Sequence, residues 1–177
     1  TDYNILNSPC KRDIVKEYAE AFRQRGLKVC LYYSILDTHH NIRAGWANNE
    51  DHLDFIKEQL TELLTNYGEI TCLVLDGWDA EWSRISYEDI SFREIYDHVK
   101  SLQPHCLISE HNAGKYPATE LFYTDIKHYE QNAGQMISRE TNKLPAQSGI
   151  PINKNWFWKE NFPDMPVVSA DVIVNEN

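Results

Sequence analysis

The sequence predicts an α/β fold of parallel βα units that forms part of a (β/α)8 TIM-like barrel and lacks the barrel's N-terminal strands. Three observations support this fold class. Segments with helical period alternate along the chain with short apolar runs, and those runs show no polar alternation. Continuous apolar strands are buried on both faces, as in parallel sheets. The chain has 177 residues, whereas a whole barrel needs at least roughly 200.

The helical segments repeat apolar residues at intervals of three and four. Ser91 and Glu94 match a capping box before the last segment, and Pro104 follows its end. Another helix is expected to begin near Ser169. The predicted helices run from Lys11 to Arg25, from Glu50 to Tyr67 and from Phe92 to Leu102.

The apolar runs between these helices are predicted to be parallel, neighbouring strands. They cover residues 28–34, 70–76 and 105–110. Because the carboxyl ends of parallel strands form the binding face of α/β folds, the polar residues there should share one edge. These residues are Asp37, Asp76, Glu110 and His111. Residues 111–167 lose the helical period and hold five of the seven prolines, which predicts long irregular loops.

Composition narrows the classes of partner. The net charge of −10 disfavours binding to nucleic acid, because an acidic surface repels phosphate. There is no apolar run near the roughly 18 residues that a membrane span needs. Aromatic residues make up 12% of the chain, which suits a sugar ligand, although core packing explains most of them. No cofactor is expected. The spacing of cysteines and histidines does not complete a metal site.

Five short motifs follow one another in order: residues 1–17, Leu31–Asp37 with His39-His40, Gln59–Gly68, Leu73–Trp78 and Ile152–Trp156. Their succession resembles that of α-L-fucosidases, which are retaining glycoside hydrolases. The resemblance covers nearly the whole chain and implies one partial catalytic barrel domain over residues 1–177. It also implies an exo-glycosidase that releases terminal α-L-fucose from a fucosylated glycan. By the same resemblance, the location would be periplasmic, secreted or lysosomal-like.

A retaining glycosidase needs two carboxyl groups about 5 to 5.5 Å apart. Asp76 matches the family's nucleophile, at a strand end followed by Gly77. Glu130 is the candidate acid/base, because Tyr129-Glu130-Gln131 resembles the family's P-E-Q segment. Glu110 and Glu120 are the alternatives.

Three further side chains are candidates for the sugar pocket. Tyr32 lies on the smaller, more polar face of its strand and is expected to point inward, in preference to Tyr33. His40 follows that strand, and Trp78 is expected to stack on the sugar or its aglycone, with core packing as the alternative.

The sequence also departs from the family pattern. The family's Trp before the nucleophile is Val74 here, and its D-W is Asp37-Thr38. A strand with tandem histidines would precede Thr1, so we expect the chain to be inactive alone. The alternative function is a non-catalytic, carbohydrate-binding or degenerate barrel fragment. An open parallel edge also makes an oligomer an expectation.

Overall fold

The computed structural model describes residues 3–43, 50–111, 124–130, 145–149 and 169–171. The elements in chain order are η1 (Ile5–Asn7), α1 (Ile14–Arg23), β1 (Cys30–Ser34), α2 (Glu50–Asn66), β2 (Cys72–Asp76), α3 (Phe92–Leu102), β3 (Leu107–His111), β4 (Ile126–Glu130) and β5 (Ala146–Gly149). Residues 170–171 are helical, close to the expected start near Ser169.

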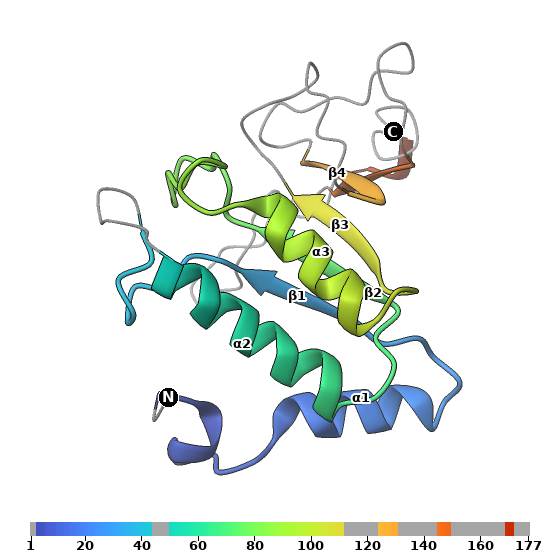
Figure 1. Cartoon of the computed structure of the whole chain (residues 1–177). Coiled ribbons are helices and arrows are strands. Elements are labelled where there is room, and N and C mark those ends of the chain that lie inside the picture. Colours follow the sequence, from blue (N-terminus) through green and yellow to red (C-terminus); the bar gives the residue numbers. More distant parts are fainter. Residues whose placement is uncertain (1–2, 44–49, 112–123, 131–144, 150–168, 172–177) are drawn as a thin grey trace.

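The strands form one parallel sheet in the order β1-β2-β3-β4-β5 (Figure 1). The prediction that the first three apolar runs are parallel neighbours is therefore confirmed. The register aligns one residue from each strand, a set that we call the Asp76 row. The Asp76 row consists of Ser34, Asp76, His111, His128 and Gln147.

Helices α2 and α3 cover one face of this sheet (Figure 1). They bury Ile56 and Leu60 from α2 and Ile95 from α3, all at 0% exposure, against Leu75 and Ile108 of the strands. Burial of such side chains contributes about 1.5–3 kcal/mol each, so this layer holds the helices to the sheet. The apolar residues that repeat along each predicted helix are the ones that pack against the sheet.

The Ser91 half of the predicted capping box of α3 is confirmed, while the Glu94 carboxylate accepts a hydrogen bond from Lys57 Nζ at 2.8 Å. The Ser91 side chain accepts a hydrogen bond from the backbone N–H of Glu94, at 3.3 Å. This bond satisfies one of the N–H groups that a helix leaves free at its start. Among the described residues, no helix is both long and apolar enough to cross a bilayer.

The prediction of long irregular loops over residues 111–167 is wrong where β4 and β5 lie. The β4 segment Ile-Lys-His-Tyr-Glu and the β5 segment Ala-Gln-Ser-Gly contain no continuous apolar run. Their strand conformation is set by pairing with neighbouring strands, and β-propensity depends strongly on that context. A search for apolar runs therefore does not find them.

Candidate active site

Asp76 ends β2, and its carboxyl group is contacted by two hydrogen-bond donors and by an imidazole ring. The Tyr32 hydroxyl donates a hydrogen bond to Asp76 Oδ2. The backbone N–H of Gly77 donates to Asp76 Oδ1 at 2.7 Å. His111 Nδ1 lies 3.4 Å from Asp76 Oδ2. Asp76 is only 6% exposed, and a buried carboxyl group needs such polar partners for its oxygen atoms.

Gly77 is required by this local geometry. Its φ is +116°, in a region that side chains disfavour. A Cβ at this position would also lie 2.7 Å from Ile35 Cγ1. The residue after Asp76 can therefore approach β1 closely, while its N–H turns back to the carboxylate.

Tyr32 and Tyr33 point to opposite faces of β1. The Tyr33 hydroxyl donates a hydrogen bond to Gln59 Oε1 of α2, at 2.6 Å, so Tyr33 faces the helices. Tyr32 lies on the face of Asp76 and is 57% exposed. The structure thus brings Tyr32, and not Tyr33, to Asp76.

Beside His111 lies His128, which our sequence reasoning missed. The ring centroids of the two imidazoles are 4.2 Å apart. Gln147 Nε2 lies 2.8 Å from His128 Nδ1 and 2.9 Å from Ser109 Oγ. The pKa of His128 is lowered to about 4, because burial and then the neighbouring His111 oppose its protonation, while Asp76 acts in the opposite direction. His128 lies in a short segment of mixed apolar and polar residues, Ile126–Glu130, within the region predicted to be loops. No other feature of the sequence points to His128 as a site residue.

Trp78 corrects one expectation. Its side chain is 1% exposed, so it offers no open face to a sugar. The indole N–H donates to the backbone carbonyl of Ile90 at 2.7 Å, and the ring packs on Phe92 with centroids 5.0 Å apart. Core packing, the alternative considered for Trp78, is what the structure shows.

His40 is held within the turn that follows β1. Its Nδ1 lies 2.8 Å from Asp37 Oδ2, and its ring packs on Phe55 with centroids 4.3 Å apart. The backbone N–H of His40 also donates to Asp37 Oδ1 at 3.0 Å. These contacts tie His40 to the turn and to α2, while Asp76 is contacted by other residues.

The candidate acids differ in position. Glu110 is 0% exposed, and its Oε1 accepts a hydrogen bond from the Tyr87 hydroxyl. Because side chains alternate along a strand, Glu110 points to the face opposite that of His111 and Asp76. Glu110 is therefore not placed to act across a glycosidic bond from Asp76.

Glu130 is the last residue of β4 and pairs with Gly149, instead of lying within a long loop. It occupies the position two residues beyond His128, at the carboxyl end of the sheet. Its side chain and the whole of Glu120 lie outside the described residues.

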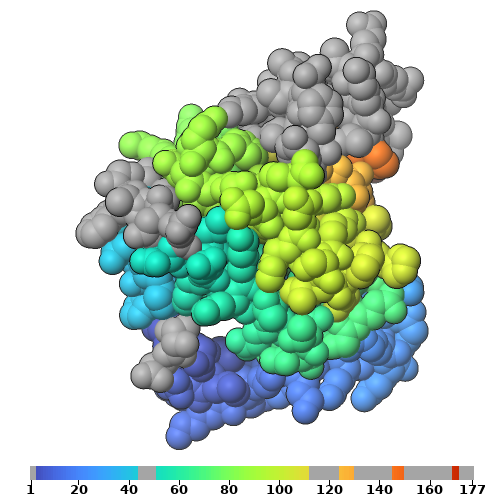
Figure 2. Space-filling view, viewed as in Figure 1, coloured from blue at the N-terminus to red at the C-terminus, as the bar shows by residue number. Residues whose placement is uncertain are grey.

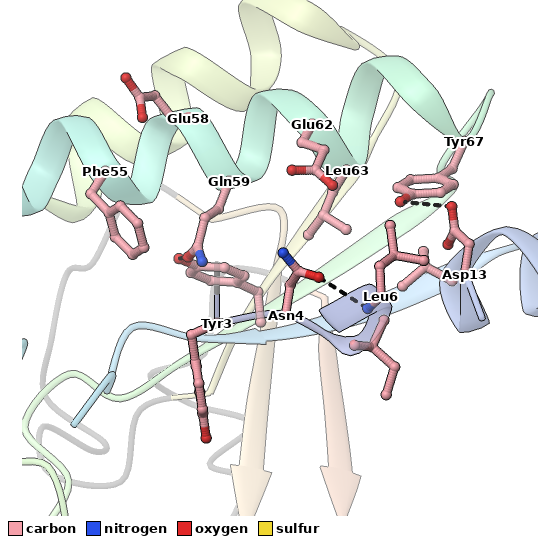
Figure 3. Close-up of a pocket in the computed structure, with 13 residues that line it drawn as sticks. Tyr3, Asn4, Leu6, Asp13, Phe55, Glu58, Gln59, Glu62, Leu63 and Tyr67 are labelled. Atoms are coloured by element: carbon pink, nitrogen blue, oxygen red, sulfur yellow. Dashed lines mark hydrogen bonds between the residues drawn. The ribbon is translucent and has the colours of Figure 1, made fainter. Parts of the chain in front are cut away.

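A hollow lies away from Asp76. Figure 2 shows it between the N-terminal segment and α2, and its volume is about 360 Å³. Acidic and aromatic side chains line it, and the Tyr67 hydroxyl donates to Asp13 Oδ2 at 3.3 Å (Figure 3). Of the predicted site residues whose side chains the structure describes, none lines this hollow. Within the described ranges, no three His, Cys, Asp or Glu side chains are grouped to hold a metal ion.

Comparison with known proteins shows the family to which this chain belongs. The family model for alpha-L-fucosidase matches residues 1–176. The chain belongs to the alpha-L-fucosidase family. It is 27% identical to alpha-L-fucosidase 1 of Arabidopsis thaliana, over 99% of this chain and 38% of the relative. It is 37% identical to a putative alpha-L-fucosidase 1 of Oryza sativa subsp. japonica, over 89% of this chain and 33% of the relative. The chain therefore spans about a third of the length of these relatives.

Solved structures of the family share the fold. Alpha-L-fucosidase isoenzyme 1 from Paenibacillus thiaminolyticus matches with a TM-score of 0.71 and 29% identity, over 93% of this chain and 44% of that one. AlfC from Lactobacillus casei, solved with the α-L-fucose product, matches with a TM-score of 0.62 and 26% identity, over 91% and 53%. The predicted class, parallel βα units in part of a (β/α)8 barrel, is confirmed for this fucosidase-family chain.

Proposed function

We propose that the protein containing this chain is a retaining α-L-fucosidase, which hydrolyses terminal α-L-fucose from glycans. The observation that carries the proposal is the environment of Asp76, a nearly buried carboxyl group at a strand end with hydrogen bonds from Tyr32 and Gly77 and with His111 3.4 Å away. The family membership and the fucose bound in the L. casei relative support fucose as the sugar.

In the proposed mechanism, an oxygen of Asp76 attacks the anomeric carbon while Glu130 protonates the departing glycosidic oxygen. The bond to the aglycone breaks, and a fucosyl ester forms on Asp76. Glu130 then removes a proton from water, which attacks the same carbon and releases Asp76 as the carboxylate. The donors around Asp76 stabilise the carboxylate before attack and again as it leaves.

The first experiment replaces the nucleophile in the native protein. Asp76→Asn keeps the shape but removes the attacking charge, and should slow hydrolysis of 4-nitrophenyl α-L-fucoside by about 10³-fold or more, or about 4 kcal/mol in barrier. Asp97→Asn is the matched control, because Asp97 is exposed on α3 and pairs with Arg93. Turnover of Asp76→Asn near that of the native protein would remove Asp76 from this role.

The acid requires its own experiment. Glu130→Ala should slow substrates with poor leaving groups far more than aryl fucosides, because a good leaving group needs little protonation. Added azide should restore turnover of the activated substrates by attacking the fucosyl ester. Equal losses on both substrate types without azide rescue would assign the acid to Glu120 instead.

We propose that the chain is inactive by itself, because it spans only about a third of the length of its relatives. Binding of fucose without any hydrolysis by the native protein would favour the alternative, a non-catalytic carbohydrate-binding protein.

A further inference from the structure

His111 and His128, the imidazole pair, stand on adjacent strands at paired positions of the Asp76 row. We propose that His111 is a positioning residue that orients Asp76, and that the neutral ring of His128, anchored by Gln147, fixes His111 in place. The proposal deepens the proposed function, since it assigns the support of the same nucleophile. It rests first on the 3.4 Å approach of His111 Nδ1 to Asp76 Oδ2 and on the 4.2 Å separation of the two rings.

The contacts of His128 determine its tautomer. The amide nitrogen of Gln147 only donates hydrogen bonds. Its two neighbours are His128 Nδ1 at 2.8 Å and Ser109 Oγ at 2.9 Å, so one hydrogen goes to each. His128 Nδ1 then accepts, and the ring proton resides on Nε2. His128 is accordingly neutral, in line with the burial that opposes its protonation.

The neutral state of His128 matters for Asp76. The groups that face His128 are His111 from β3, Asp76 from β2, and the uncharged Gln147 and Ser109. A positive charge on His128 would compete with His111 for the carboxylate. A neutral ring instead gives His111 a fixed packing surface beside Asp76, with His111 Nδ1 held 3.4 Å from Asp76 Oδ2.

The Nε2 edge of the His128 ring, opposite the Nδ1 that Gln147 contacts, packs against Gly149 of β5. A Cβ on Gly149 would lie 2.8 Å from His128 Nε2 and 3.0 Å from its Cε1. Glycine at this position thus leaves just the space that the ring occupies. Support for Asp76 extends in this way from His111 on β3 through His128 on β4 to Gly149 on β5.

Gly149→Ala tests the proposal through the space that the His128 ring fills, and His128→Phe is needed beside it, because Gly149 also pairs with Glu130. The new methyl group should push the ring away, release His111, and lower kcat by about tenfold or more, with KM within about twofold. Ser148→Ala is the matched control, since Ser148 is the adjacent residue on β5 and points to the opposite face. His128→Phe should have the same effect as Gly149→Ala. Its control is His98→Phe, because His98 on α3 bonds to Thr61.

Conservative replacement separates positioning from mere packing. His111→Leu should lower kcat by about 10²-fold. His111→Asn carries an amide donor near the former Nδ1 and should recover a large part of that loss. A rise in KM with unchanged kcat in these variants would instead make His111 a direct sugar contact, and would overturn the proposal.

Imidazole NMR spectra of the native protein provide a readout that is independent of activity. His128 should show the Nε2–H tautomer throughout about pH 5 to 8, and Gly149→Ala should shift the His111 resonances while Ser148→Ala leaves them unchanged. An Nδ1–H tautomer, or titration of His128 at the ordinary value, would overturn the proposal. Absence of fucosidase activity in the native protein would count against the proposed function, whereas the spectra would still decide the arrangement of the imidazole pair.

Discussion

Replacement of Gly77 by alanine tests the geometry directly behind the candidate nucleophile. The alanine Cβ would lie 2.7 Å from Ile35 Cγ1, and Ile35 is 1% exposed in the core. At a φ of +116° the alanine would also be strained, whatever the space around it. Gly77→Ala is thus expected to destabilise the protein through two separate effects.

The two effects have comparable magnitudes. A non-glycine residue in a sparsely populated backbone region costs about 1–3 kcal/mol. An extra methyl group forced into a packed core costs about 1–3 kcal/mol more. We therefore expect the free energy of unfolding to fall by about 2–6 kcal/mol. Since the Gly77 N–H donates to Asp76 Oδ1, kcat should fall as well.

Gly26→Ala is the control that isolates the backbone effect. Gly26 also has a positive φ, +69°, but no atom lies within 4 Å of a Cβ built there. Urea unfolding of both variants, followed by tryptophan fluorescence, should show Gly77→Ala to be the less stable by about 1–3 kcal/mol. Equal losses of stability in the two variants would refute the predicted contact with Ile35.

Two predictions concern stability more widely. The free energy of unfolding should decline as the pH falls from about 6.5 to about 4, because the unfolded chain protonates His128 at its ordinary pKa while the native pKa is lowered to about 4. His128→Phe should flatten this decline in urea unfolding at several pH values, and an unaltered decline would contradict the pKa argument. Trp78→Phe should cost about 1–3 kcal/mol, because the Ile90 carbonyl loses its donor. If Trp78→Phe instead weakened fucose binding and left the free energy of unfolding unchanged, Trp78 would be a sugar contact.

Local patterns were sufficient for several parts of the molecule. The period of apolar residues identified α2 and its packing face, since a helix repeats every 3.6 residues whatever it packs against. The Ser91 cap acts within one turn of α3 and is therefore visible in the sequence. Asp76 at the end of an apolar run, with Gly77 after it, marked the carboxyl edge of β2.

Sequence patterns alone were enough to predict the fold class, the first three strands, the helices between them and the position of Asp76 at a strand end. Which side chains meet around Asp76 depends on how the strands pair. Trp78 could pack in the core or face a ligand, and only its bond to Ile90 and its burial distinguish the two. His128 and Gln147 come together because β4 and β5 pair in a register that no local pattern encodes. Strand pairing joins residues far apart in the chain, so its partners are chosen by the whole fold.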